Sequence, residues 1–168
     1  MNEAVNQTNG NSNGDGNAAV QLALQKIYIK DFSFEAPNSP EVFLEADLQP
    51  VEPQIQLNLK NSHQNLADEH VEVVLHASLH AKAEDRTLFM IEVDQAGLFI
   101  MQGCTDEQRK TLIGTYCPAS LFPYLREAIS SIIGKGGFPA MLLQPINFDA
   151  LFAQAMQEHA QQSGRLDS

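Results

Sequence analysis

A two-residue alternation from Val71 to Lys82 constrains the fold more than any other feature of this sequence. Every odd position of the stretch is apolar, and most even positions are polar. A period of two is typical of a β-strand that buries one face and turns the other to polar surroundings. The apolar set comprises Val71, Val73, Leu75, Ala77, Leu79 and Ala81. The stretch therefore predicts a strand in a sheet with one covered face.

Three further segments have strand character, and short connections join the later ones. Residues 55–60 alternate, a turn is expected at 84–86, and 88–99 follows as another strand. Within 88–99, alternation places Met90 and Glu92 on one face and the neighbouring odd residues on the other. Consecutive alternating strands joined by short turns predict an antiparallel meander with one face covered.

The first strand is expected over 24–35. Its alternation divides the residues between two faces. One face would carry Ile27, Ile29, Asp31, Ser33 and Glu35, and the other would carry Tyr28, Lys30, Phe32 and Phe34.

Helices are expected from Thr105 onward. Thr105 and Gln108 form a capping-box pattern, and a glycine pair after Lys135 favours the end of a second helix. Asn147 can cap a last helix. The apolar stripe of the second helix comprises Leu121, Leu125, Ile129, Ile132 and Ile133. Strands followed by helices predict the α+β class.

The domain boundaries follow from composition. Residues 1–22 are expected to form a disordered Asn- and Gly-rich tail, 23–160 a single domain, and 161–168 a second disordered tail. The Pro-punctuated stretch 36–54 is expected to be irregular. The first nineteen residues contain no Lys or Arg and no apolar core, unlike a signal peptide, so we expect a cytoplasmic location. No apolar run reaches the roughly 18–20 residues of a membrane helix, so no insertion into a membrane is expected.

The formal charge of −11 is concentrated in one part of the chain. Nine acidic residues lie between Asp31 and Glu72, against the single base Lys60. Nucleic acid is a poor partner for such a surface, because phosphate binding needs clustered Lys and Arg. A basic protein surface is a good partner, since opposite fields steer encounter.

No motif indicates catalysis, a metal or a cofactor. His76 and His80 have the spacing of a helical metal pair, but on a strand they would stand about 13 Å apart. The glycines at 134–137 follow a helix and lack the spacing of a phosphate loop. Cys104 and Cys117 have no C-x-x-C partner. We therefore expect a protein that is not an enzyme.

Five motifs, in order and without large gaps, resemble those of SecB, the bacterial protein-export chaperone family. They read QKIYIKDFSFEAPNSP at 25–40, EVDQAGLF at 92–99, YCP…LFPY.RE at 116–127, GGFP at 136–139 and PINFDALF at 145–152. The resemblance spans about 25–155. It implies the SecB fold, a four-stranded antiparallel sheet with two main helices on one side, assembled as a tetramer built from two dimers.

The resemblance also implies a function. A SecB-like protein is an ATP-independent holding chaperone that binds unfolded preproteins and delivers them to the translocation ATPase SecA. The family's SecA contacts correspond to Asp31, Glu35, Met90 and Glu92 of this chain. Ile91, Val93 and Gln95 correspond to oligomer or core positions. The alternatives are a SecB-like chaperone of a toxin–antitoxin system and an enzyme with scattered catalytic residues.

A client groove is expected between the Pro-rich segment and the helices. A chaperone that binds many unfolded chains needs an apolar, adaptable surface. Five residues can supply it, although all five can equally be ordinary core residues: Phe43, Leu48, Leu142, Phe152 and Met156. The chain has no Trp, and Leu48 stands nearest to the position where close SecB relatives carry one.

Overall fold

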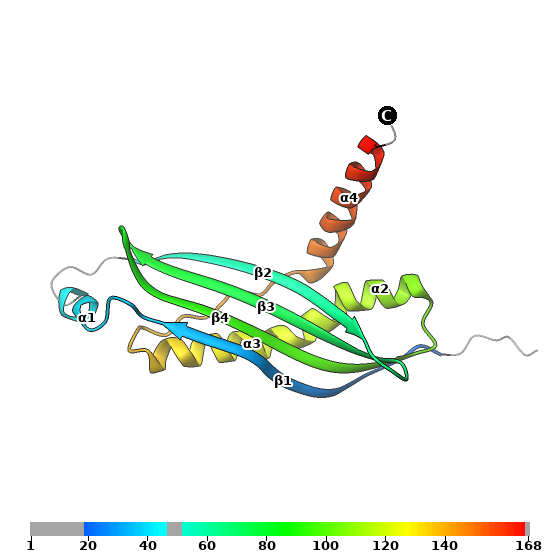
Figure 1. Ribbon diagram of the computed structural model, residues 1–168, viewed down its shortest axis with the longest axis horizontal. Helices are drawn as coiled ribbons and strands as arrows, with labels where there is room; N and C mark the ends of the chain where they lie inside the picture. Colours follow the sequence, from blue (N-terminus) through cyan, green and yellow to red (C-terminus); the bar gives the residue numbers. More distant parts are fainter. Residues whose placement is uncertain (1–18, 47–51, 167–168) are drawn as a thin grey trace, which may run out of the picture.

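The computed structural model of the chain describes residues 19–46 and 52–166. Its strands are β1 (Gln21–Glu35), β2 (Gln54–Asn65), β3 (His70–Ala83) and β4 (Arg86–Gln102). Its helices are α1 (Glu41–Ala46), α2 (Asp106–Gly114), α3 (Tyr116–Lys135) and α4 (Phe148–Leu166). The strands form one sheet in the order β1-β4-β3-β2, and all neighbours are antiparallel (Figure 1).

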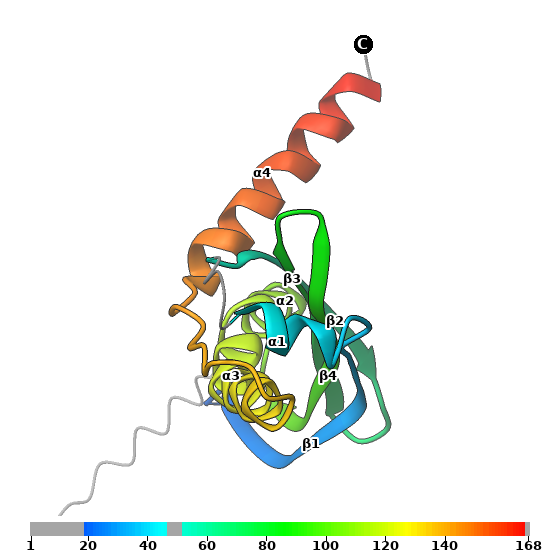
Figure 2. The same cartoon turned by 90° about the vertical axis from the view of Figure 1, so that its left-hand side faces the viewer.

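The sheet has one face covered by helices. In Figure 2, α2 and α3 lie on one side of the sheet, and α4 leaves this layer at an angle. The alternation of β3 is confirmed, because its odd residues from Val71 to Ala81 are buried and its even residues are not. They pack with Phe89, Ile91 and Val93 of β4 and with the buried stripe of α3. The predicted α+β fold, with a four-stranded antiparallel sheet and its main helices on one side, is confirmed.

Strand β1 departs from the predicted alternation. Its register against β4 shifts twice, between Leu24 and Lys26 and between Ile29 and Asp31, so each shift adds one residue to β1. An extra residue turns the following side chains to the opposite face. The prediction that Ile27 and Ile29 share a face with Asp31, Ser33 and Glu35 is therefore wrong. Ile27 packs against the core with Phe32 and Phe34.

The helix ends follow local chemistry. Thr105 and Gln108 form the predicted capping box of α2, each side chain accepting from the other residue's backbone N–H. Asn147 caps α4 by accepting from the amide of Ala150 at 3.0 Å. Helix α4 continues to Leu166, so the predicted disordered tail is wrong for 161–166. Residues 167–168 and 1–18 of the predicted tails lie outside the described residues, while 21–22 already belong to β1.

The Pro-rich stretch is more ordered than expected. It contains the short helix α1, so the prediction that all of 36–54 is irregular is wrong for Glu41–Ala46. Two contacts attach this part to the β3–β4 hairpin. Asn38 donates to the carbonyl of Thr87 at 2.8 Å, and Arg86 donates to the carboxylate of Glu45. The α1 region is therefore tied to one end of the sheet.

Candidate functional site

The open face of the sheet, which no helix within the described residues covers, carries the four residues that sequence motifs suggest for partner binding. Glu35 pairs with Met90, and Ser33 pairs with Glu92, so the side chains of Glu35, Met90 and Glu92 share the open face. Asp31 pairs with Asp94 one step further along. The structure therefore brings Asp31, Glu35, Met90 and Glu92 together on two adjacent strands. We call these four residues and Asp94 the acidic face.

Asp94 is the member of the acidic face that sequence reasoning missed. Its carboxylate accepts a hydrogen bond from Nδ1 of His76, on the next strand, at 2.5 Å. Lys60 of β2 pairs with His76, so Asp31, Asp94, His76 and Lys60 follow one another across the four strands. The alternation of 88–99 already placed Asp94 beside Glu92, so the signal was present in the sequence. The pairing with His76 needed the strand register.

A second polar group ties β1 to β3 across β4. The hydroxyl of Tyr28 and the ammonium of Lys30 both donate to Glu72, the latter at 2.6 Å. On β4, between these two strands, Ala96 pairs with Tyr28 and is fully buried. Desolvation, together with the hydrogen bond to Glu72, raises the pKa of Tyr28 to about 12. The hydrogen bonds from Lys30 and Tyr28 lower the pKa of Glu72 below its usual range.

Ile91, Val93 and Gln95 point to the covered face and are buried within the subunit. Ile91 and Val93 are apolar and belong to the main core. Gln95 is 3% exposed, and its Nε2 donates to the backbone carbonyl of Tyr28 at 3.2 Å. All three therefore occupy core positions in a single chain.

The four candidate client-binding residues that the structure describes lie on different elements. Phe43 of α1 packs on Phe138, with ring centroids 5.1 Å apart, and Phe138 packs on Phe89 of β4. Phe152 lies on α4, where its ring faces Gly114 of α2. Helices α1 and α4 stand at different parts of the molecule in Figure 1.

The connection between α3 and α4 joins these two places. It runs back along α3 toward the start of α4 (Figures 1 and 2) and carries Leu142, which is 63% exposed. Met156 of α4 is 40% exposed. Leu48 lies outside the described residues. We call Phe43, Leu142, Phe152 and Met156 the apolar flank, and the prediction that these residues bind clients stays a prediction.

Helix α4 leaves most of its apolar stripe unpacked. Phe148 at its start is buried and meets Phe122 edge to face, at a centroid distance of 5.8 Å. Beyond the half-buried Phe152, the residues of the stripe are exposed, including Met156. Leu151, beside Phe152, is also 47% exposed. Exposed apolar surface of this kind marks an interaction site.

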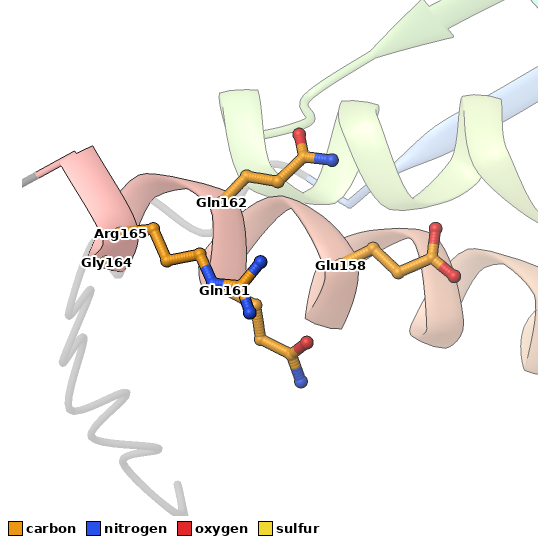
Figure 3. Close-up of a pocket in the computed structure, with 5 residues that line it drawn as sticks. All are labelled: Glu158, Gln161, Gln162, Gly164 and Arg165. Carbon is orange, nitrogen blue, oxygen red and sulfur yellow. The ribbon is translucent and has the colours of Figure 1, made fainter.

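Two surface cavities adjoin α4. One, of about 460 Å³, lies between β2, α2 and α4 and is lined by His63, Asn65, Asp106, Arg109, Lys110, Ile113 and Phe152. Figure 3 shows another, of about 530 Å³, whose labelled residues all come from the last turns of α4 and do not converge on one point. Over 19–46 and 52–166, no cluster of His, Cys, Asp and Glu has the arrangement of a metal site. In the same described part of the chain, no helix is long and apolar enough to cross a membrane.

Comparisons with known proteins agree on one family. The family model described as "Preprotein translocase subunit SecB" matches residues 15–159. "Protein-export protein SecB" of Nitrosococcus oceani is 46% identical, over 92% of this chain and 93% of its own length. The protein of the same description from Xylella fastidiosa is 49% identical, over 83% of this chain and 79% of its own.

A solved structure has a similar fold. It is a SecB-like chaperone of Mycobacterium tuberculosis in complex with a ChAD peptide from the HigA1 antitoxin. The TM-score is 0.63 at 15% identity, covering 75% of this chain and 91% of that one. At this identity the likeness bears on the fold alone.

Proposed function

The chain belongs to the SecB family of protein-export chaperones, and from this premise we propose that it is an ATP-independent holding chaperone of the cytoplasm. It binds unfolded preproteins, keeps them competent for translocation across the inner membrane and delivers them to SecA. One observation carries the proposal. An acidic sheet face and an exposed apolar flank lie on separate surfaces of one small domain, so two partners can bind at once.

SecA docks on the acidic face by charge. Glu35 lies opposite the apolar Met90, Glu92 follows Met90 on β4, and Asp31 lies further along the same face beside Asp94. The partner surface is basic. Charged contacts at the rim of an interface mainly set the encounter rate and the orientation of the partners. Because salt screens such contacts, the affinity for SecA falls as ionic strength rises.

The experiment reverses two charges of this face. In the double variant Asp31→Lys, Glu92→Lys, SecA binding is lost while capture of an unfolded preprotein is retained. The matched control is Glu84→Lys, Asp85→Lys at the tip of the β3–β4 hairpin, where both residues are exposed. The control changes the net charge by the same amount and leaves SecA binding in place. Unchanged SecA affinity in the Asp31, Glu92 variant would remove the docking assignment.

Clients bind along the apolar flank. Its members are Phe43, Leu142, Phe152 and Met156 of the described residues, with Leu48 from the segment next to α1. Unfolded chains share little except apolar side chains and backbone, so their binding surface needs apolar groups that repack, and Met suits this task. The free edge of β2 adds backbone donors and acceptors that pair without regard to sequence.

The working unit is a homotetramer, a dimer of dimers. A single chain leaves Tyr116 and Tyr124 of α3 half-exposed, together with Leu151 of α4, on the helical side of the sheet. Surplus apolar surface of this kind favours self-association with closed symmetry. Ile91 and Val93 support the assembly from within the subunit, because they lie in the core on which α3 packs, and the buried Gln95 follows them on β4. Light scattering should give four times the 18.5 kDa of one chain, and a monomer at micromolar concentration would contradict this.

No observation favours a toxin–antitoxin role for this chain. The M. tuberculosis chaperone with the antitoxin peptide shares the fold at 15% identity. The relatives at 43–49% identity are described as protein-export proteins. Protein export is therefore the function we propose, and no catalytic step is part of it.

A further inference from the structure

We propose that the β-bulge at Lys30 is a positioning element for the acidic face, held by Gln95 from the covered side and by Glu72 from the open side. Gln95 and Glu72 are then positioning residues that act through Asp31. The inference rests on the proposed docking of SecA at Asp31, and the experiment below separates the two.

The bulge decides which face Asp31 occupies. Ile29 pairs with Gln95 and Asp31 pairs with Asp94, so two steps along β1 match one step along β4. Without the extra residue, Asp31 would share the face of Ile29, since side chains alternate along a regular strand. With it, Asp31 and Glu35 both face the side of Glu92. The bulge therefore places Asp31 and Glu35, two of the three carboxylates suggested for docking, on the open face.

Gln95 holds the bulge from the covered side. It is the one polar residue in the buried class over the described parts of the chain. A buried amide needs a partner, and the partner of its Nε2 is the carbonyl of Tyr28, 3.2 Å away, two residues before Lys30. Its pairing partners in the sheet are Ile29 and Leu75, both apolar. Packing between Ile29 and Leu75 would be satisfied equally well by a leucine. We therefore assign the amide of Gln95 to the hydrogen bond with the backbone beside the bulge.

Glu72 holds the bulge from the open side. It accepts from Tyr28 and from Lys30, the residues that stand on either side of Ile29. A carboxylate with two donors from one segment fixes the path of that segment across β4. The Asp31 carboxylate is oriented in turn, because its Oδ1 accepts from the amide of Phe32 at 3.0 Å. The contacts thus run from Gln95 and Glu72 to the bulge, and from the bulge to Asp31.

The test is a double-mutant cycle on SecA affinity, using the full-length assembled protein. Gln95→Leu keeps the apolar packing and removes the donor to Tyr28. Loss of one such hydrogen bond should weaken SecA binding by roughly three- to ten-fold. In the Asp31→Asn background the same substitution should have a much smaller effect, because Asp31, which directly follows the bulge, no longer carries its charge and only Glu35 can still be displaced.

A stability-matched control excludes a general effect on the fold. Ile113→Val removes one methylene from the core at α2, away from β1, and should leave SecA affinity unchanged. If Gln95→Leu alters the tetramer seen by light scattering, Glu72→Gln takes its place in the cycle, since Glu72 lies on the open face. Amide hydrogen exchange at Ile29–Phe32 should accelerate in both Gln95→Leu and Glu72→Gln.

The outcomes distinguish the inference from the function on which it rests. If Asp31→Asn alone leaves SecA affinity unchanged, the docking site is wrong and the inference falls with it. If Asp31→Asn weakens binding but the effect of Gln95→Leu is simply added to it, docking stands and the positioning role is overturned. If Gln95→Leu weakens SecA binding clearly more when Asp31 is intact than in the Asp31→Asn background, the docking site and the positioning role are both supported.

Discussion

Helices α3 and α4 are similar in length and in apolar periodicity, yet the chain uses them in opposite ways. Helix α3 buries eight residues, among them Leu121, Leu125 and Ile129, between the sheet and its neighbours. Over 148–165, helix α4 buries only Phe148, half-buries Phe152 and leaves the rest of its stripe exposed. An amphipathic pattern therefore indicates that a helix packs its apolar stripe on another surface. It does not indicate whether that surface is the sheet of its own chain or another molecule. We infer that the stripe of α4 serves clients and that of α3 serves the fold.

The largest expected difference between the two helices is in thiol reactivity. Burial raises the pKa of Cys117 in α3 to about 12, so at neutral pH its reactive thiolate is scarce. In the variant Cys104→Ser, Ala155→Cys, the new thiol lies on the exposed side of α4. Labelling at position 155 should be faster than at Cys117 by roughly a thousand-fold.

The pH dependence of labelling checks this explanation. As pH rises toward 12, the thiolate of Cys117 becomes populated and its labelling should accelerate, provided that the fold persists. Equal labelling rates at both sites near neutral pH would show that α3 opens as readily as α4, and the comparison would fail.

The next largest effect is on stability, through a core residue of α3. Leu125 is fully buried, so Leu125→Ala leaves a cavity and should lower the free energy of unfolding by about 2–5 kcal/mol. The measurement is urea-induced unfolding followed by circular dichroism. A loss comparable to that of an exposed α4 substitution would contradict the role of α3 as the core helix.

A substitution at the contact between α2 and α4 sharpens the comparison. A Cβ at Gly114 would overlap the ring of Phe152, one of the few side chains that anchor α4. Gly114→Ala should displace Phe152 and speed amide exchange in α4. Overall stability should change by less than about 1 kcal/mol, because alanine also favours the helix α2. Exchange in α4 that stays as slow as in the unchanged chain would show that other contacts anchor this helix.

The smallest effect on stability is expected from the exposed end of the stripe. Met156→Ser should leave the melting temperature within about 2 °C, since surface substitutions rarely exceed ±0.5 kcal/mol. Capture of an unfolded preprotein should nevertheless weaken. The companion substitution Leu48→Ser tests the other end of the proposed flank in the same two assays. A large decrease in the melting temperature with unchanged capture of preprotein would show that these residues belong to the core and not to the client surface.

The sequence sufficed for the sheet and the helix caps because these depend on local pattern. The alternation of 71–82 located β3 and its buried face, and Thr105 and Asn147 located the starts of α2 and α4. The alternation of 88–99 likewise placed Met90 and Glu92 on one face, as β4 has them.

The rest depends on contacts that alternation does not encode. Nothing in 24–35 marks Lys30 as an extra residue, because a bulge is defined by its register against β4. Helix α4 was expected to end near 160, since its last turns carry few apolar residues to indicate packing. The spread of Phe43 and Phe152 along a flank follows from tertiary topology, which no local pattern in this chain specifies.

The most direct test of the central claim is the refolding of an aggregation-prone preprotein diluted from denaturant, followed by light scattering without nucleotide. We predict that an equimolar tetramer suppresses the scattering and that the held preprotein passes to SecA when SecA is added. The Asp31→Lys, Glu92→Lys variant should suppress scattering equally well but fail in the transfer. Aggregation that proceeds unchanged in the presence of the protein would contradict a holding chaperone.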